Sequence, residues 1–569
     1  MPALRLIFLS FLVGVWAAAC GTDGRRPLPT PDLLSSGTGF RQAAVVCAHP
    51  LAAKAGRLAL LFGGNAVDAA VAVHFALAVV YPNAGNLGGG GFMMYRPAAG
   101  QVYCLDFREV APQAAHRTLF LDNKGRPVPG LSTETALAAG VPGSVAGLAE
   151  AHRRFGRLPW YWLLKPAVHL AEKGFPVTAR QAEELNENAP LFRERNPKCP
   201  PFVAPRPEGW QAGDTLRQPE LARALLGLAQ EGPSCFYTGW IADSLEAWMR
   251  AHGGLITRAD LQAYRPVWRR PLHVLLDTLD LWAPPPPSAG GLSVLQMLRL
   301  QSLLRWPPQS LHHPEMVWRY CHAAHLAFED RYLYAADPDH LPVPVELLLD
   351  SAYLLRRYRT LELHRFAPWP GRGSAAFHES TTHFSIADAE GGLLALTTTL
   401  NDSYGSRLCV CGAGFLLNNE MDDFSVAPGV KNLYGLPGSP RNAVAPGRRM
   451  VSSMAPILVE RRGRPFLAVG TPGGTTIVST LYLTLYWTLV LNQPLEAFHS
   501  QKRYHYQALP DVLFHEEGAW SDSLAGRLRT MGLVLRSRAP IGRMDGLQRR
   551  DGLWYAAPDP RGDDAAEGF

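Results

Sequence analysis

The sequence predicts an α+β protein, in which both strand patterns and helix patterns occur along the chain. Residues 382–387 and 393–400 flank the turn 389–392, and the first of them alternates polar and apolar side chains, which indicates a β-hairpin. Residues 140–365 carry Leu, Ala and Arg at helical spacing and are predicted to be mostly helical. Near the C-terminus, two apolar strands at 455–459 and 466–469 precede a long apolar helix from about residue 475 to 491.

The composition is that of a large globular protein. Of 569 residues, 47% are hydrophobic and 18% are charged, and the net charge of +6 is small for this length. The densest basic segment with aromatic side chains, residues 264–270, holds three charges, and no basic stripe continues it. We interpret it as a surface turn with solvated arginines, and we expect no nucleic-acid partner.

Eight cysteines are spread along the chain without a CxxC pair, which excludes a thioredoxin-type motif and a zinc ribbon. No HExxH or other convincing metal-ligand spacing occurs, so we expect no metal site. Cys199 and Cys235 are one disulfide pairing that the sequence permits without establishing it. Cys409 and Cys411 are expected to be strand residues on one face.

The first twenty residues have the pattern of an export signal. Arg5 precedes an apolar run at 6–15 that is too short to span a membrane comfortably, and three alanines precede Cys20. Small residues before a cysteine resemble the lipobox of bacterial lipoproteins, which predicts lipidation of Cys20; a plain signal peptide is the alternative. We expect residues 1–20 to be the signal, residues 21–40 to be a flexible tether, and the protein to be exported, either to the periplasm or as a membrane-anchored lipoprotein facing away from the cytoplasm.

Along the N-terminal part, residues 65–80 are predicted to be a buried helix that Pro82 stops. Four glycines at 88–91 precede a predicted strand, and no Lys-Ser/Thr follows them, which argues against a phosphate or dinucleotide site. A strand at 102–107 ends at Arg108. A guanidinium at a strand exit is well placed to bind a carboxylate, and an ion pair with Asp106 or Glu109 is the structural alternative.

Thr381, just before the predicted hairpin, has the most informative chemistry. A mid-chain threonine hydroxyl is a poor nucleophile, but cleavage just before Thr381 would free an α-amine that acts as a base on the same residue. A turn near residue 390 pairs position 381 with roughly position 400, which brings the hydroxyl of Thr399 and the amide of Asn401 beside Thr381. An ordinary threonine-rich hairpin would show the same pattern, because threonine favours strands.

Two later segments have the composition to complete such a site. Two asparagines and three carboxylates lie between residues 418 and 423 and are a plausible cradle for an ammonium group; a polar turn is the alternative. Gly473 and Gly474 lie between a predicted strand and a predicted helix. Backbone N–H groups at such a helix start can donate to the negative charge that develops on a carbonyl oxygen during nucleophilic attack. A structural Gly-rich turn would look the same.

Eight motifs, in order along the chain, resemble the γ-glutamyltransferase (glutathione hydrolase) family of N-terminal-nucleophile hydrolases. They lie at residues 63–70, 83–92, 106–109, 141–147, 381–383, 417–424, 451–454 and 472–474. The resemblance runs from about residue 43 to near the C-terminus. It implies a four-layer αββα fold, with two antiparallel sheets between helical layers, and it implies no cofactor.

The resemblance also implies roles residue by residue. Thr381 would be the nucleophile, freed by self-cleavage between Ser380 and Thr381 into a large subunit (41–380) and a small subunit (381–569) that stay together as a heterodimer. The other implied roles are support of the nucleophile by Thr399, an oxyanion hole at Gly473 and Gly474, α-carboxylate binding by Arg108, Ser452 and Ser453, α-amino binding by Asn401, Glu420 and Asp423, and a lid loop at 430–441 that includes Tyr434.

These roles predict a γ-glutamyl hydrolase and transferase. Thr381 would attack the γ-carbonyl of glutathione or another γ-glutamyl compound, and the acyl-enzyme would pass the group to water or to an amino acid or peptide. One alternative is a family member that acts on another amide, such as a glutaryl-cephalosporin; the full set of zwitterion-binding residues argues against it. The other is an unprocessed, inactive binding protein, against which the intact catalytic set argues.

Overall fold

The computed structural model describes residues 39–361 and 381–569. The predicted signal, Cys20, most of the predicted tether and Ser380 lie outside the described residues. The last two residues of that tether, Gly39–Phe40, form the short strand β1 and pair with a strand near the C-terminus, so the predicted tether extends too far at this end.

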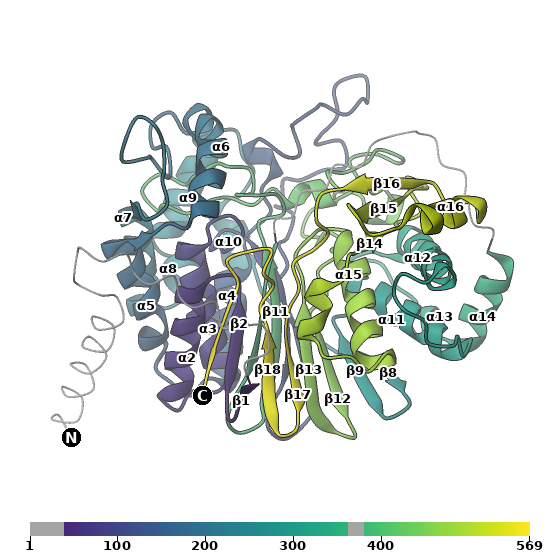
Figure 1. The fold of residues 1–569 in the computed structure, drawn as a ribbon. Coiled ribbons are helices and arrows are strands. Elements are labelled where there is room, and N and C mark those ends of the chain that lie inside the picture. Colours follow the sequence, from purple (N-terminus) through teal and green to yellow (C-terminus); the bar gives the residue numbers. More distant parts are fainter. Residues whose placement is uncertain (1–38, 362–380) are drawn as a thin grey trace.

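Two antiparallel sheets occupy the centre of the molecule (Figure 1). In spatial order, sheet I consists of β19 (Ala565–Gly568), β2 (Ala44–Cys47), β10 (Thr381–Ala387), β11 (Leu393–Thr399), β3 (Gly90–Arg96), β4 (Tyr103–Asp106) and β7 (Val267–Arg269). Sheet II consists of β1, β18 (Leu553–Ala557), β17 (Asp545–Arg550), β13 (Arg464–Gly470), β12 (Ile457–Arg461), β9 (Leu279–Ala283) and β8 (Leu272–Leu276). Residues on both sides of position 381 therefore contribute strands to both sheets.

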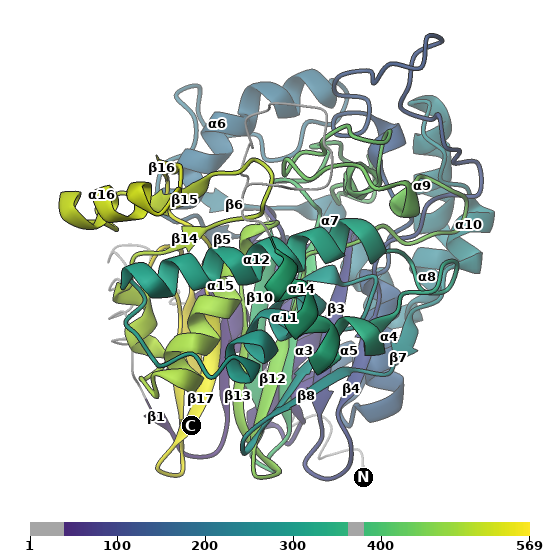
Figure 2. The same ribbon diagram turned by 90° about the vertical axis from the view of Figure 1, so that its right-hand side faces the viewer.

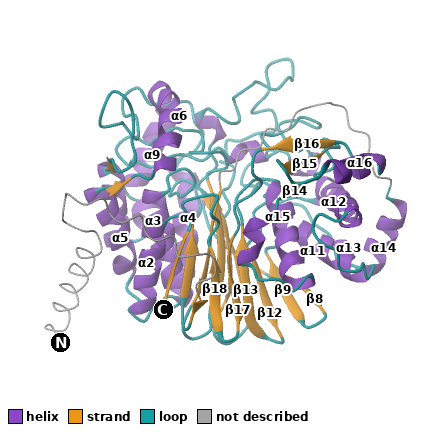
Figure 3. Cartoon of the chain, viewed as in Figure 1, coloured by secondary structure: helices purple, strands orange, loops and turns teal. Residues whose placement is uncertain are grey.

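Helices cover the outer face of each sheet, as the purple and orange layers of Figure 3 show. On sheet I lie α2 (Pro50–Leu61), α3 (Ala66–Val80), α4 (Ser144–Phe155) and α5 (Trp160–Lys173), with α6 (Ala179–Arg195), α7 (Pro219–Glu231), α8 (Ser234–Tyr237), α9 (Trp240–Ala251) and α10 (Arg258–Ala263) further out. On sheet II lie α11 (Ala289–Leu303), α12 (Pro314–Tyr334), α13 (Val345–Leu348), α14 (Ser351–Thr360), α15 (Thr476–Leu485) and α16 (Asp522–Thr530).

Strand β2 illustrates how the layers are held together. Its side chains alternate, so that Val45 and Cys47 pack among the helices over sheet I while Ala44 and Val46 pack against sheet II. Because both faces of the strand are buried, its sequence is continuously apolar rather than alternating. The predicted α+β class and its four αββα layers are confirmed.

Several predicted elements are confirmed, and the stretch predicted to be mostly helical also contains strands. Helix α3 begins after Asn65, whose side chain accepts hydrogen bonds from the first turn, and ends at Val80 as predicted. The stretch 140–365 is not helical throughout, because residues 267–283 form β7, β8 and β9. The alternation of apolar residues in these strands is short, and the surrounding Leu-rich sequence resembles a helix pattern. Pairing of β7 with β4 and of β9 with β12 determines their conformation.

The basic segment at 264–270 is not a turn of solvated arginines. Arg269 lies in β7 with a side chain that is 8% exposed, and its guanidinium contacts Asp106 and Asp339 at 2.6 and 2.7 Å. These partners come from distant parts of the sequence, so the spacing of the basic residues carries no sign of them. The prediction of a solvated surface turn is therefore wrong at this residue.

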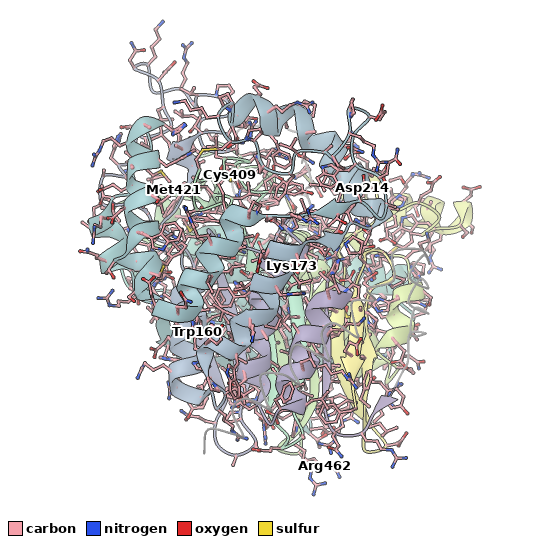
Figure 4. All side chains as sticks on the ribbon, turned by 90° about the vertical axis from the view of Figure 1, so that its left-hand side faces the viewer. Trp160, Lys173, Asp214, Cys409, Met421 and Arg462 are labelled. Atoms are coloured by element: carbon pink, nitrogen blue, oxygen red, sulfur yellow. A yellow bond between two sulfur atoms is a disulfide. The ribbon has the colours of Figure 1, made fainter. Side chains whose placement is uncertain are left out.

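One disulfide joins Cys199 to Cys411, 212 residues apart, near the labelled residue Cys409 in Figure 4. The pairing of Cys199 with Cys235 is therefore wrong; Cys235 is a buried free thiol. Cys411 lies in a turn rather than in a strand, and Cys409 makes only an isolated bridge to Leu416. Within 39–361 and 381–569, no helix has both the length and the apolar character needed to cross a membrane.

Two small sheets complete the described residues. Strands β5 (Phe175–Pro176) and β6 (Thr215–Leu216) pair beside α6. Strands β14 (Tyr504–His505), β15 (Leu513–Glu516) and β16 (Leu535–Arg538) form the other, which lies above α15 in Figure 1.

Candidate active site

The predicted site residues gather at one end of the two sheets. Thr381 begins β10, Thr399 ends β11 directly opposite, and β13 ends at Gly470, just before the predicted glycine pair. In Figure 4, Met421, from the segment with the predicted ammonium cradle, lies far from Arg462, which lies in the turn joining β12 to β13 at the other end of the sheets. Antiparallel strands that start and stop at the same edge thus bring together residues far apart in the chain.

The hairpin places two threonine hydroxyls in contact. Thr381 pairs with Thr399, one position from the predicted register, and its Oγ1 donates a hydrogen bond to Thr399 Oγ1 at 3.3 Å. The backbone N–H of Asn401 donates to the same Thr399 oxygen at 2.9 Å. Asn401 leaves the strand at φ 79°, a left-handed conformation that asparagine tolerates better than most residues. The predicted neighbours of Thr381 are therefore at its side.

Asn86 anchors the end of β11 from the helical side. Its Nδ2 donates to Thr398 Oγ1 and to the Thr399 carbonyl, each at 3.1 Å, and its Oδ1 accepts a hydrogen bond from Ser144 Oγ at 2.7 Å. All three partners are buried. The sequence gives Asn86 a place in a motif but no role, and we assign it the positioning of the strand that carries Thr399.

Arg108 lies at the centre of a buried carboxylate cluster. Its guanidinium contacts Glu420 and Asp423 at 2.5 Å each and Glu109 at 3.5 Å, and its side chain is 1% exposed. Asp106 accepts a hydrogen bond from the backbone N–H of Arg108 instead. The predicted carboxylate-binding guanidinium and the two predicted amine-binding acids are thus direct neighbours, and an ion pair with Glu109 is present as well.

Burial dominates the protonation of these acids. It raises the pKa of Glu109 to about 7 and the pKa of Glu420 well above its usual range, while Arg108 opposes both shifts. It also raises the pKa of Asp423, again against the pull of Arg108. Three carboxylates around one guanidinium compete for the same positive charge. Their oxygens therefore lack enough hydrogen-bond donors and can accept hydrogen bonds from an incoming ammonium group.

Glu109 offers a direct test of this electrostatic arrangement. Because the pKa of Glu109 is raised from 4.5 to about 7, it stabilises the fold below about pH 4.5, relative to a residue that does not titrate, and this contribution is lost as the pH rises through about 7. We therefore expect the stability of Glu109→Gln, relative to the wild type, to increase with rising pH. The Tm of the variant minus the Tm of the wild type should be at least about 2 °C larger at pH 8 than at pH 5. Thermal unfolding monitored by circular dichroism across this range measures it, and a constant difference would contradict it.

Two serines form another wall of the site. Ser452 Oγ accepts a hydrogen bond from the backbone N–H of Met454 at 3.1 Å, and Ser453 Oγ accepts one from Arg331 at 2.8 Å. Ser452 also forms a parallel bridge with Ser288, the residue just before α11. Both serines are nearly fully buried. The segment that carries them is attached to Arg108, because Arg108 Nε donates a hydrogen bond to the Met450 carbonyl at 3.4 Å.

The glycine pair presents two backbone N–H groups beside Thr381. Gly473 and Gly474 are buried, and among the described residues neither N–H donates to a protein acceptor. Buried N–H groups are rarely left without an acceptor, so this pair is suited to a substrate oxygen. Their φ values of 129° and 56° favour glycine, and α15 begins two residues later, which adds the positive end of a helix.

Tyr434, from the predicted lid loop, contacts both Asn401 and Gly474. Its hydroxyl donates to the Asn401 carbonyl at 2.6 Å, and its ring lies so close to Gly474 that a Cβ at that glycine would be 2.4 Å from it. Asp422 and Asp423 hold the same loop, because Leu433 N–H donates to Asp422 at 2.8 Å and Asn432 Nδ2 donates to Asp423 at 3.2 Å.

These residues line one cavity with about 260 Å³ of empty space, part of which is open to solvent. Its lining consists of Arg108, Thr381, Thr399, Asn401, Glu420, Asp423, Tyr434, Ser452, Ser453, Met454, Gly474 and Ile477. Of the predicted site residues that the structure describes, only Gly473 is outside this lining. The cavity therefore brings together the hydroxyl of Thr381, the predicted oxyanion glycine Gly474 and side chains of both charges.

The sequence analysis did not identify two candidate functional residues, Glu109 and Arg331. Glu109 was visible only as an ion-pair partner of Arg108, and its burial inside the cluster has no sequence signal. Arg331 lies on α12 with no motif around it, and the one other arginine of this helix, Arg319, pairs with Glu315. Only the packing of α12 against the segment at 451–454 brings Arg331 to Ser453.

Comparison with known proteins shows the family of the chain. A family model described as gamma-glutamyltranspeptidase matches residues 52–569. The glutathione hydrolase proenzyme of Pseudomonas aeruginosa is 41% identical over 525 residues, which cover 91% of this chain and 93% of that protein. The Acylase ACY 1 proenzyme of Pseudomonas sp. (strain SE83) is 35% identical over 439 residues, which cover 76% of this chain and 77% of that protein.

Solved structures lead to the same family. The crystal structure of Helicobacter pylori gamma-glutamyltranspeptidase matches with a TM-score of 0.54 and 36% identity, and the match covers 60% of this chain and 95% of that chain. The cephalosporin acylase from Bacillus halodurans matches with a TM-score of 0.80 over 96% of this chain and 99% of that chain. Its identity of 24% makes it evidence for the fold alone.

Proposed function

The chain belongs to the gamma-glutamyltranspeptidase family of γ-glutamyl hydrolases and transferases, and we propose that it cleaves the γ-glutamyl amide of glutathione and related compounds with Thr381 as the nucleophile. The observation that carries this proposal is the single cavity that Thr381, Gly474 and Arg108 line together, with the backbone N–H groups of Gly473 and Gly474 left without a protein acceptor among the described residues. A γ-glutamyl group needs these features together, because it carries a zwitterionic head and a distant amide.

The head of the substrate would lie among the charged residues. Its α-carboxylate would accept hydrogen bonds from Arg108 and from the hydroxyls of Ser452 and Ser453, while its ammonium group would donate to Asn401, Glu420 and Asp423. Hydrogen bonds to charged groups contribute about 1.5–3 kcal/mol each, so this set can select a zwitterion strongly. The γ-carbonyl would then reach Thr381, one side-chain length away.

The reaction would run in two steps. The α-amine of Thr381 takes the proton from its own hydroxyl as Oγ1 attacks the γ-carbonyl, and the oxyanion accepts hydrogen bonds from the N–H groups of Gly473 and Gly474. The amine leaving group takes up the proton and departs, leaving a γ-glutamyl ester on Thr381. Water, an amino acid or a peptide then attacks the ester and regenerates the hydroxyl.

This chemistry requires that Thr381 be an N-terminal residue. We propose self-cleavage between Ser380 and Thr381, which would divide the chain into residues 41–380 and 381–569. The relatives named as proenzymes support a processed precursor. The strands of both parts are interleaved in sheets I and II, so the two parts would stay together as one αββα unit. The signal pattern at the N-terminus supports export before or during this maturation.

Two amides that differ in one group test the substrate class. The purified protein is assayed with γ-glutamyl p-nitroanilide and with glutaryl p-nitroanilide, which lacks the α-amino group, as a cephalosporin-type acyl group would. We expect kcat/KM to be about 100-fold higher for the γ-glutamyl compound, because Glu420 and Asp423 otherwise remain buried without a cation from the substrate. Equal turnover would favour the acylase alternative, and no turnover of either by a chain that stays uncut would favour the binding protein.

A further inference from the structure

Arg331 is a cation beside the active site whose role no motif indicates. It lies near the C-terminal end of α12, the long helix that crosses the outer face of sheet II in Figure 2. Its NH1 donates a 2.8 Å hydrogen bond to Ser453 Oγ, and Ser453 lines the cavity that holds Thr381. A contact from α12 therefore reaches the wall that is proposed to bind the α-carboxylate.

The charge of Arg331 is not neutralised by a direct partner. Among residues 39–361 and 381–569, no carboxylate lies within 4.0 Å of its guanidinium, although the electrostatic influence of Asp423 reaches it. By contrast, Arg357 on the neighbouring helix α14 contacts Glu329 and Asp330 at 2.6 and 3.3 Å. Burial lowers the pKa of Arg331 to about 10, and the guanidinium is still a cation at neutral pH. A partly buried cation without a counter-ion is stabilised by an anionic ligand nearby.

The polarity of the hydrogen bond with Ser453 is fixed. A guanidinium has donors and no acceptor, so Ser453 Oγ must accept, and its own O–H remains free to donate elsewhere. Ser452 is held in the same way, because its Oγ accepts from the Met454 N–H. Both hydroxyl hydrogens are therefore available to an anion in the cavity, and for Ser453 this orientation depends on Arg331.

The positive charge of Arg108 is shared among three acidic side chains. Its guanidinium already contacts Glu109, Glu420 and Asp423. An α-carboxylate that enters beside three acids needs a positive potential from another group. Arg331 is the cation that supplies it on the serine side, since it contacts Ser453 and lies within electrostatic reach of Arg108.

We propose that Arg331 is a positioning residue for the substrate's α-carboxylate: it holds the Ser453 hydroxyl as a hydrogen-bond donor and adds positive charge to that wall, so that the enzyme selects donors with an α-carboxylate. This inference rests on the proposed function. It assigns Arg331 a part in recognition and none in the attack of Thr381, so its loss should weaken binding of the head group and leave the chemistry of the amide intact.

A second cavity offers an alternative role for Arg331, in binding the leaving group of the substrate. Arg331 also lines a space of about 580 Å³ beneath the lid loop, together with Asp423, Asn432, Leu436 and Gln507. A carboxylate on the leaving group, such as that at the glycine end of glutathione, would meet Arg331 there directly. The two explanations differ in which carboxylate of the substrate feels the loss of Arg331.

The experiment removes the charge from the enzyme and the carboxylate from the substrate. Wild type, Arg331→Met, Arg331→Lys and the control Arg319→Met are assayed with γ-glutamyl p-nitroanilide and with 4-aminobutanoyl p-nitroanilide, which lacks only the α-carboxylate. The control removes a guanidinium from the same helix that contacts Glu315 and does not line the cavity. Where turnover of the second compound is too slow, its inhibition constant against the first is measured. Thermal unfolding checks that each variant is folded.

We expect Arg331→Met to lower kcat/KM for the γ-glutamyl anilide about 10- to 100-fold, mainly through KM, the scale of a lost hydrogen bond to a charged group. Its effect on the 4-aminobutanoyl compound should stay within about 3-fold, because that compound has no carboxylate to lose. Arg331→Lys should restore part of the loss, and Arg319→Met should change neither value.

Three outcomes would overturn the inference while wild type remains active. Equal losses with both compounds would show a merely structural role. Unchanged kinetics with the γ-glutamyl anilide would remove the role altogether. A loss seen with glutathione and not with the anilide would assign Arg331 to the leaving group. An inactive wild type would instead overturn the proposed function, and this inference with it.

Discussion

Replacing Thr381 with alanine should give a chain that stays uncut and inactive. The alanine has no hydroxyl to attack either the preceding peptide bond or a γ-glutamyl amide, and its partner Thr399 cannot substitute from the neighbouring strand. Loss of a covalent nucleophile lowers kcat by about 10⁴-fold or more. A denaturing gel with reductant should show one full-length band for Thr381→Ala and two shorter bands for the wild type, whose lighter fragment should begin Thr-Thr-His-Phe on N-terminal sequencing.

Two variants frame this result. Thr381→Ser keeps a hydroxyl and should still be processed, more slowly. Thr382→Ala is the matched control: Thr382 is the next residue of the same buried strand, and in the part of the chain that the structure describes its hydroxyl has no hydrogen-bond partner. It should be cut and active within about 10-fold of the wild type. Cleavage of Thr381→Ala at the same bond would refute self-processing by this residue.

Gly474→Ala should lower kcat by about 10²–10³-fold, the effect of losing an oxyanion-hole donor. An added Cβ would lie 2.4 Å from the Tyr434 ring, so either the ring or the backbone of the glycine pair must move. A shift of the backbone turns the N–H groups away from the position of the oxyanion. The prediction is checked with γ-glutamyl p-nitroanilide at saturating concentration, on protein already processed into two fragments.

Gly463→Ala is the control for this change. Gly463 also has a positive φ, of 71°, but it lies in the turn between β12 and β13, and nothing lies within 4 Å of an added Cβ. It shares the backbone strain of the Gly474 variant without its clash, so kcat should stay near that of the wild type. If Gly474→Ala were no slower than Gly463→Ala, the glycine pair would not be the oxyanion site.

The positions of the site residues were more predictable than their electrostatics. The hairpin register was correct to one residue, because the turn at 389–392 and the strand pattern together determine which residues oppose each other. The glycine pair and the asparagine-rich segment lie where strands end, and strand ends can be read from periodicity. The encirclement of Arg108 by three acids depends on burial, which no local pattern records.

The remaining misses share one physical cause. Residues 267–283 became strands, Arg269 became a buried ion pair, and Arg331 reached Ser453, each through a partner from a distant part of the chain. Local propensity decides such segments only weakly, and tertiary pairing overrides it. Sequence motifs indicate which residues are candidates to bind the substrate. The residues that orient those candidates are identified only in the folded structure, where the layers pack together.

The bridge between Cys199 and Cys411 connects a residue before position 380 to one after it. Maturation at Ser380–Thr381 would therefore leave two polypeptides that a covalent link still holds, so without a thiol reductant the mature enzyme should run as a single species of almost the precursor's size. Cys411 follows Asn401 by ten residues, on the segment that continues to Glu420. If the chain is cut at the proposed bond, the same crosslink would keep the segment proposed to bind the substrate's ammonium group attached to the N-terminal portion.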